Sequence, residues 1–465
     1  MDWELKPVGG SFRDPAGHVY DVDDHIFRTV SEVALAEFEF VRESGLHEKL
    51  FADKRLVASE LVPAGDAATM FPGAAAVIEH PKIDFISYPY EWCFSGLKDA
   101  ALMHLDIQLE ALGRGIALSD ASAYNIQFEG TSPYFIDVLS FRRYISGEFW
   151  TGHRQFCEQF LNPLLLRALV GIPHNSWYRG TLEGIPTSEI ARILPFRHAF
   201  SLNVLTQVFL QARLERQALR NRGKVAAAIK KKELPEHAYR GLLIQLRRWI
   251  AKLKPRDSGG SVWGNYAGDN TYSTDETTEK EKAIAEFVSA TRANTVWDLG
   301  CNTGNYSIAA LRGGALKVVG FDFDQIAIEG LYQRAKTEGH NILPLWLDAT
   351  NQSPSQGWRQ AERMGLNERA SADVVLALAF VHHLAIGRNI PLGEILDWFV
   401  NLAPRGVIEF VQKDDPTVQE MLALRKDIFP HYNEDAFRDE LSKRAHISRE
   451  VKISASDRIL FFFEA

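Results

Sequence analysis

The sequence predicts an α/β fold for residues 259–465, built on a Rossmann-like, seven-stranded sheet. Three observations support this prediction. Strand-like and helix-like apolar patterns alternate regularly after about residue 271. A glycine-containing turn follows the first of these strands, and acidic residues stand at the ends of the next two. The last two apolar runs, at residues 451–454 and 459–464, are typical of an antiparallel hairpin.

The first strand of this region covers Thr295 to Asp298, and the turn after it contains Gly300 and Gly304. Glycine allows a tight turn and lets the backbone approach a ligand with no Cβ in the way. An apolar helix begins around Tyr306, and the free N–H groups of its first turn would face the crevice at the carboxyl ends of the strands. The glycine spacing differs from Gly-x-Gly-x-x-Gly, which argues against a nicotinamide cofactor.

Acidic residues end the second and third strands. The second strand, residues 316–322, ends in Asp322, with Asp324 just beyond it, and the third ends at Asp348. A carboxylate accepts hydrogen bonds and donates none, so Asp322 is suited to the two hydroxyl groups of a ribose. Asp348 can accept a hydrogen bond from the amino group of an adenine. The pattern therefore predicts a site for an adenine nucleoside.

Two histidines follow the fourth strand, residues 372–380. His382 and His383 would lie at the rim of the crevice, where an imidazole can act as a general base near neutral pH. The alternative is that one of them only packs against or caps the following helix. Glu409 and Lys413, at the end of the fifth strand, are further candidates for binding a substrate. No ordered set of carboxylates indicates a metal site.

Together these segments resemble class I S-adenosylmethionine-dependent methyltransferases, whose first motif has the form Asp-Leu-Gly-Cys-x-x-Gly seen at 298–304. The C-terminal hairpin is also typical of that sheet. A narrower resemblance is to a bacterial group of large methyltransferase-like proteins, some of them named nodulation proteins. It is carried by Tyr272-Ser, the segment 298–307, His382-His-Leu-Ala-Ile, and Ile408-Glu-Phe-Val with Asp415-Pro.

The resemblance implies a cofactor, S-adenosyl-L-methionine, and a set of residues that bind it. Tyr266 or Tyr272 would cover the methionine end of the cofactor. The other implied cofactor-binding residues are Asp298, Gly300, Cys301, Gly304, Asp322, Asp348 and Ala379. From their position after the fourth strand, His383, and after it His382, are the expected catalytic residues.

Residues 1–200 form a predicted α+β domain with a pattern that resembles protein-kinase-like folds. Asp120 and Asn125 have the Asp-x-x-x-x-Asn spacing of a kinase catalytic loop, and Asp137 follows where a kinase keeps its metal-binding Asp. We expect Asp137 on a strand, a helix over residues 97–112 before the loop, and a strand and hinge within 83–92.

Three interpretations of this N-terminal pattern stay open. Val-Ala-x-Lys is missing upstream, and Arg28 is a weak substitute for the lysine that aligns the phosphates. The domain is then an active kinase, a degenerate kinase-like fold used for substrate binding or scaffolding, or an unrelated fold. In the last case Asp120 and Asn125 only satisfy backbone groups in a turn.

Residues 201–258 form a predicted basic helical connector, which Pro235 divides into two pieces. Its lysines and arginines could bind an anionic partner, but such side chains more often coat an exposed helix face. The net charge of −8 argues against nucleic-acid binding. Three cysteines without metal or disulfide spacing, and no signal-peptide-like or membrane-spanning run, predict a cytoplasmic protein.

The sequence therefore predicts a methyltransferase that acts on a hydroxyl or amine of a small-molecule or carbohydrate-type acceptor. The N-terminal region would contribute to acceptor binding or to a homo-oligomer. Two alternatives remain open. One is a bifunctional kinase–methyltransferase, and the other is a non-catalytic regulatory protein that binds S-adenosylmethionine.

Overall fold

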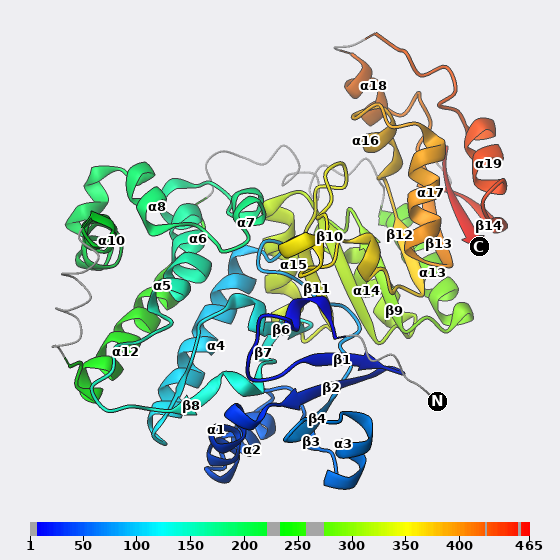
Figure 1. Ribbon diagram of the computed structural model, residues 1–465. Coiled ribbons are helices and arrows are strands. Elements are labelled where there is room, and N and C mark those ends of the chain that lie inside the picture. Colours follow the sequence, from blue (N-terminus) through cyan, green and yellow to red (C-terminus); the bar gives the residue numbers. More distant parts are fainter. Residues whose placement is uncertain (1–6, 221–232, 257–273, 424–425, 454–456) are drawn as a thin grey trace. The chain divides into compact units, whose positions relative to one another are not determined.

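The computed structural model describes residues 7–220, 233–256, 274–423, 426–453 and 457–465 (Figure 1). The chain forms two compact units, and each includes a short segment from the other half of the sequence. Unit 1 consists of Met1–Phe128, Pro133–Ser258 and Ser355–Met364, and unit 2 consists of Glu129–Ser132, Gly259–Pro354 and Gly365–Ala465. Among the described residues, no helix combines the length and the apolar character needed to cross a bilayer.

Unit 2 contains the predicted seven-stranded sheet. Its strands are β9 (Thr295–Leu299), β10 (Lys317–Asp322), β11 (Ile342–Trp346), β12 (Val374–Ala377), β13 (Arg405–Phe410), β14 (His446–Ile453) and β15 (Arg458–Glu464). Its helices are α13 (Thr274–Thr291), α14 (Asn305–Arg312), α15 (Gln325–Glu338), η9 (Asn367–Arg369), α16 (Val381–Ala385), α17 (Leu392–Leu402), α18 (Pro416–Leu422) and α19 (Glu434–Ser442).

The strand order is β11-β10-β9-β12-β13-β15-β14, with the first five strands parallel and β15 antiparallel to both of its neighbours. The α/β prediction is therefore confirmed, hairpin included. The five residues of β9 are all buried, as expected for a central strand with helices on both faces. After β11 the chain returns to place β12 beside β9, so the order reverses next to β9. Ligands of open α/β sheets bind at such a reversal, outside the carboxyl ends of the strands.

Unit 1 combines a small antiparallel sheet with a helical part (Figure 1). Its strands are β1 (Val19–Val22), β2 (His25–Val30), β3 (Glu60–Leu61), β4 (Ala76–Pro81), β5 (Ile116–Leu118), β6 (Ile126–Glu129), β7 (Ser132–Phe135) and β8 (Phe141–Arg143). The sheet has the order β1-β2-β4-β3, while β5 pairs with β8 and β6 with β7. Gly130 and the residues around it, at the turn between β6 and β7, belong to unit 2.

The described helices of unit 1 are η1 (Gly9–Ser11), α1 (Glu32–Glu43), α2 (Leu46–Ala52), α3 (Ala64–Met70), α4 (Phe94–Leu112), η2 (Ala123–Asn125), η3 (Val138–Ser140), α5 (His153–Phe156), η4 (Cys157–Leu161), α6 (Asn162–Leu165), η5 (Leu166–Val170), α7 (Asn175–Thr181), α8 (Thr187–Ile193), η6 (Phe196–Phe200), α9 (Leu202–Val204), η7 (Leu205–Leu210), α10 (Gln211–Arg220), α12 (Glu236–Lys252) and η8 (Trp358–Gln360). Among the described residues of unit 1, α4 is the longest helix, and α12 and α6 pack against it.

Two expectations for the N-terminal region need correction. The expected strand within 83–92 is absent; the strand before α4 is β4, which ends at Pro81, and residues 82–93 have no regular strand. Asp137 does not lie on a strand. It follows β7 and caps η3, because its side chain accepts the N–H of Leu139 and so satisfies a backbone donor at the start of that turn.

The second half of the expected connector packs within unit 1. Pro235 immediately precedes α12, where its fixed φ suits the start of a helix. Four residues spaced at helical intervals, Tyr239, Leu243, Leu246 and Ile250, form the buried face of α12, which packs against α4. Arg247 borders this face, and its guanidinium pairs with Asp106 of α4, whereas Arg248 and Lys252 are exposed.

Candidate functional site

A cavity of about 410 Å³ lies at the carboxyl ends of the unit 2 strands. Its lining comes from four groups of residues: the turn after β9 with the start of α14, the ends of β10 and β11, the segment from the end of β12 to Arg388, and single residues of α13 and α18. The lining residues are Thr277, Leu299, Gly300, Cys301, Asn302, Thr303, Asn305, Tyr306, Phe321, Asp322, Phe323, Asp324, Leu347, Asp348, Ala349, Thr350, Leu378, Ala379, Phe380, His383, Leu384, Gly387, Arg388 and Met421.

The glycine turn forms one wall of this cavity. Gly300 and Gly304 both have left-handed φ angles, 73° and 82°, which glycine adopts without strain. The N–H groups of Gly300 and Cys301 donate to the Phe321 carbonyl of β10 at 2.8 and 3.0 Å, and this fixes the turn to the neighbouring strand. The sequence-predicted Gly300 and Cys301 therefore both face the cavity.

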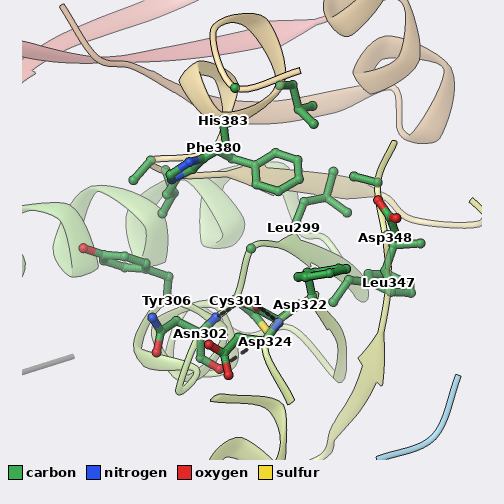
Figure 2. Close-up of a pocket in the computed structure, with 18 of the residues that line it drawn as sticks. Leu299, Cys301, Asn302, Tyr306, Asp322, Asp324, Leu347, Asp348, Phe380 and His383 are labelled. Atoms are coloured by element: carbon green, nitrogen blue, oxygen red, sulfur yellow. Dashed lines mark hydrogen bonds between the residues drawn. The ribbon is translucent and has the colours of Figure 1, made fainter. Parts of the chain in front are cut away.

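Asp322 lies at the centre of the acidic side of the cavity (Figure 2). Its two carboxylate oxygens accept the N–H groups of Asn302 and Asp324, each at 2.8 Å. A carboxylate oxygen has two lone pairs, so each oxygen can accept a further hydrogen bond from a ligand hydroxyl. Burial raises the pKa of Asp322 to about 6, although backbone hydrogen bonds from Asp324, Asn302 and Phe323 act in the opposite direction.

Asp348 and Asp324 also lie on the acidic side of the cavity, but their carboxylates accept hydrogen bonds from different donors. Asp348, directly after β11, accepts the N–H and the hydroxyl of Thr350 at 3.0 and 2.7 Å. Asp324 caps α15, where it accepts the N–H groups of Ile326 and Ala327. Asp348 thus lines the cavity as expected, while Asp324 lines it and also starts the helix behind it.

Three predicted site residues lie outside the cavity lining, which corrects the expectation of direct contact with a ligand. Asp298 is buried beneath the turn, where it accepts the hydroxyl of Ser307 at 2.6 Å, and burial raises its pKa to about 7. At Gly304 an added Cβ would meet Leu331 at 2.3 Å, so this glycine permits close packing of α14 on α15. His382 is fully buried, and burial holds the pKa of its imidazole well below the usual range.

The other histidine, His383, does face the cavity. Figure 2 shows it beside Phe380, above the glycine turn. The two histidine rings lie 4.1 Å apart between centroids. Burial lowers the pKa of His383 to about 4, so its imidazole is neutral at pH 7 and able to accept a hydrogen bond or a proton.

Of the remaining residues predicted for the site in unit 2, one lines the cavity and the others either do not line it or lie outside the described residues. Ala379 lines the cavity, in a left-handed conformation with φ of 48°. Glu409 is fully buried and does not line it, and Lys413 pairs with Asp427 instead, so neither was a correct candidate for acceptor binding. Tyr266 and Tyr272 lie outside the described residues.

Sequence reasoning missed several lining residues. Phe380 was expected as the last residue of the fourth strand, but β12 ends at Ala377 and Phe380 lies in the turn before α16; its position near a strand end was an available signal. Tyr306 was recognised only as the start of α14. Met421, on α18, had no signal of its own: the Asp415-Pro segment marks the start of α18, but nothing in it indicates that the helix reaches the cavity.

Unit 1 brings together the residues of the kinase-like pattern. The side-chain amide of Asn125 donates to Asp120 at 3.3 Å, and the Ser140 hydroxyl lies 3.1 Å from Asp120 and 2.8 Å from Asp137. Arg28 of β2 forms ion pairs with Asp137, at 3.2 Å, and with Asp14. Burial, together with the nearby charge of Asp137, raises the pKa of Asp120 to about 6. The described residues contain no group of three or more His, Cys, Asp or Glu side chains arranged to hold a metal ion.

Comparison with known proteins yields matches for both unit 2 and the whole chain. The family model of ribosomal protein L11 methyltransferase (PrmA) matches residues 274–377, which contain the glycine turn and the acidic strand ends. The PH0226 protein from Pyrococcus horikoshii OT3 is 16% identical, with 44% of this chain and 99% of that chain covered and a TM-score of 0.33. A SAM-dependent methyltransferase from Aquifex aeolicus is 17% identical, with 44% and 98% covered and a TM-score of 0.31.

A curated relative covers nearly the entire chain. Nodulation protein NoeA of Rhizobium meliloti (strain 1021) is 47% identical over 459 residues, which are 98% of this chain and 96% of the relative. The protein is an S-adenosylmethionine-dependent methyltransferase, with the methyltransferase sheet in unit 2. Its identity to the relative extends through both units, and the chain belongs to the NoeA family of nodulation proteins.

Proposed function

We propose that the protein transfers a methyl group from S-adenosylmethionine to a hydroxyl or amine of a small-molecule or carbohydrate-type acceptor, within the cavity of unit 2. One observation supports this most: the same cavity contains the acidic strand ends and a neutral imidazole, His383. Acidic groups suit the nucleoside part of the cofactor, and the imidazole suits the proton that an acceptor loses.

The cofactor would lie along the carboxyl edge of the sheet. Asp322 would accept hydrogen bonds from the ribose hydroxyls, since each of its oxygens already holds one backbone N–H and can accept another hydrogen bond. Asp348 would contact the adenine, and the turn at Gly300 and Cys301 would face the methionine part. The left-handed Gly300 leaves the room that this approach requires.

Methyl transfer is an in-line displacement. A lone pair on the acceptor oxygen or nitrogen forms a bond to the methyl carbon while the carbon–sulfur bond breaks, and its electrons neutralise the sulfonium. The acceptor proton passes to the neutral imidazole of His383. Because the pKa of His383 is lowered to about 4, this residue is a weak base, so positioning of the acceptor would supply much of the acceleration.

In this proposal the acceptor binds on the side of the cavity away from the acidic strand ends, and that side is mainly apolar and aromatic. Phe380, Tyr306, Leu384 and Met421 line it, and among the described residues Arg388 is the one arginine in the lining. Aromatic faces pack well against the C–H surface of a sugar ring, which supports a carbohydrate-type acceptor. The whole-length relative is named a nodulation protein, and we place the methyl transfer of this chain in the same process.

For unit 1 we propose a kinase-like scaffold rather than a phosphotransferase. The pairing of Arg28 with Asp137 supports this, because the carboxylate in the position of a kinase metal ligand is already compensated by a cation. A second carboxylate, Asp14, holds the same guanidinium. In this proposal unit 1 contributes to acceptor binding or to a homo-oligomer.

The test is a titration of the purified full-length protein with S-adenosylmethionine, followed by transfer of labelled methyl groups to a panel of acceptors. The panel compares amino sugars, their N-acetylated forms, and small amines without a sugar. Binding of the cofactor together with labelling of a sugar amine or hydroxyl supports the proposal. Labelling of only the small amines would refute the carbohydrate part. A well-folded protein that binds S-adenosylmethionine and labels nothing in the panel would favour a regulatory role.

A further inference from the structure

A network of four buried charges lies behind the cavity of unit 2. The ammonium of Lys280, on α13, is 2.6 Å from one carboxylate oxygen of Glu409, and both side chains are fully buried. The guanidinium of Arg458 lies 3.8 Å from the same oxygen and donates to Asp415 at 2.8 Å. Isolated charges are costly to bury, so each of these groups depends on its partners.

Glu409 is the hub of this network, and its second oxygen reaches the cavity wall. That oxygen accepts the backbone N–H of Ala379 at 2.9 Å. Ala379 has a φ of 48°, a left-handed conformation that costs a residue with a Cβ about 1 kcal/mol or more. A hydrogen bond to a buried, charged acceptor offsets that cost and holds the turn in one conformation.

The conformation of Ala379 determines where the next residue lies. Phe380 follows it and packs on Gly300, since a Cβ built on Gly300 would meet the Phe380 ring at 2.8 Å. His383 lies one turn further along α16. The position of the Phe380 ring above the glycine turn, seen in Figure 2, is therefore linked through Ala379 to Glu409.

The same network reaches the opposite side of the cavity. Asp415 accepts the N–H of Thr417 at 2.9 Å and so caps α18, the helix that carries Met421 into the lining. Thr277, one turn before Lys280 on α13, is also a lining residue. The network thus connects α13, the turn after β12, and α18, three segments far apart in sequence that line one cavity.

We propose that Glu409 is a positioning residue for methyl transfer: through Lys280, Arg458 and the N–H of Ala379, it holds the Ala379–Phe380 turn in the conformation that binds S-adenosylmethionine. It acts through the turn and touches no reactant, since it does not line the cavity. This inference rests on the proposed cofactor site and adds to it a residue that lies behind the cavity wall.

The test uses two matched double variants. Lys280→Met/Glu409→Leu replaces the buried ion pair with apolar side chains and removes the acceptor for the Ala379 N–H. Lys280→Met/Glu409→Gln removes the same ion pair but keeps an amide oxygen as acceptor. Replacing both members of a buried pair is often neutral for stability, so both proteins are expected to fold. Glu450→Gln, which changes only a surface pair with Arg438, is the control.

The leucine variant is expected to bind S-adenosylmethionine at least about tenfold more weakly than wild type, since a hydrogen bond to a charged acceptor is lost from a strained turn. The glutamine variant and the control are expected to stay within about threefold of wild type, because each keeps an acceptor for that N–H. Calorimetric titration measures the affinity, and hydrogen exchange of residues 376–384 reports on the turn itself. The leucine variant should exchange faster there.

Equal affinity of the leucine and glutamine variants, with equal exchange at the turn, would overturn the inference. If the leucine variant does not fold, Glu409→Asp takes its place. Its shorter side chain cannot reach both Lys280 and Ala379, and a wild-type affinity would then refute the positioning role. Failure of the wild-type protein itself to bind the cofactor refutes the proposed site instead, so the two failures are distinguishable.

Discussion

The ring of Phe380 lies so close to Gly300 that a Cβ on Gly300 would sit 2.8 Å from the ring. Real Cβ atoms do not approach a neighbour this closely, so the glycine and the phenylalanine fit only as a pair. Gly300 belongs to the first motif of the cofactor site, and Phe380 to the turn held by Glu409. The glycine turn after β9 and the Ala379–Phe380 turn, which form two walls of the cavity, are therefore sterically complementary.

Gly300→Ala is expected to weaken S-adenosylmethionine binding by at least about tenfold, because it adds left-handed backbone strain and also displaces Phe380. Gly339→Ala is the matched control. Gly339 has nearly the same φ, 72°, but open space around its Cβ position. Calorimetric titration of both variants separates the effect of a Cβ beside Phe380 from that of left-handed strain elsewhere in unit 2. Equal losses of affinity in the two variants would mean that contact with Phe380 is unimportant.

Asp322→Asn is expected to reduce cofactor affinity by about tenfold or more, since a charged acceptor becomes a neutral one. The pKa of Asp322 is raised to about 6, so its carboxylate is protonated below that pH and ionised above it. Wild-type affinity should therefore fall as the pH drops from 7.5 through 6 to 5.5, and the asparagine variant should show a flatter dependence. Asp397→Asn, at a surface pair with Arg444, serves as the control in the same titrations. Parallel pH curves for wild type and Asp322→Asn would contradict the assignment.

His383→Gln is expected to lower kcat by about a hundredfold while the affinity for S-adenosylmethionine changes little, as for loss of a general base. Since burial lowers the pKa of His383 to about 4, its basic form persists well below neutrality. The rate should thus stay level from pH 8 to 6. With an ordinary histidine as the base, the rate would fall within this range, because such a histidine is half protonated at about pH 6.5.

Initial rates across that pH range, at saturating cofactor, provide the measurement. His446→Gln, at an exposed position on β14, controls for the loss of a histidine in the same unit. A rate that declines with a midpoint near 6.5, or an unchanged kcat in His383→Gln, would exclude this residue as the base.

The parts of the site that sequence predicted are the local ones. The turn at Gly300, the carboxylate of Asp322 and His383 all lie at or shortly after the carboxyl end of a strand. Parallel strands bring these ends to the same edge of the sheet. Contacts between distant segments could not be predicted. Lys280 and Glu409 are 129 residues apart; Lys280 resembles a surface charge in the sequence, and Glu409 was expected to bind a substrate rather than to form a buried ion pair.

The errors have the same origin. His382 and His383 are adjacent in sequence, yet the helix they start turns one into the core and the other toward the cavity. Asp298 belongs to the first motif but points beneath the turn to Ser307. A side chain near the cavity can point into the cavity or into the core behind it. The packing of neighbouring elements, here α14 and α16, decides between the two, and the motif itself does not.

In unit 1, Arg28→Gln is expected to destabilise the fold by about 3 kcal/mol, because Asp137 and Asp14 would lose a largely buried counter-charge. Urea unfolding measures the change. Arg143→Gln, at a more exposed pair with Glu37, should cost less than about 1 kcal/mol. Titration of the wild type with MgATP is expected to give no binding heat. Binding of MgATP that disappears in Asp137→Asn would instead revive the bifunctional alternative.

His104→Leu is expected to make unit 1 less sensitive to acid. His104, on α4, is fully buried and packs against the rings of Phe156 and Phe160, and neither ring nitrogen has a hydrogen-bond partner among the described residues. Burial lowers the pKa of His104 to about 3, whereas an unfolded histidine titrates near 6.5. In the window between these values the unfolded chain binds a proton that the folded chain does not.

The stability associated with His104 is therefore complete above pH 6.5 and is lost progressively as the pH falls toward 3, by about 1.4 kcal/mol per pH unit. Between pH 7 and pH 5 wild type should lose about 2 kcal/mol more than His104→Leu. At pH 7 the leucine variant should be at least as stable as wild type, because it removes a buried polar ring without partners in the described structure. Urea unfolding at the two pH values measures both effects, with His237→Gln on the exposed face of α12 as control. If His104→Leu and wild type lose the same stability between pH 7 and pH 5, another buried group must account for the acid sensitivity of unit 1.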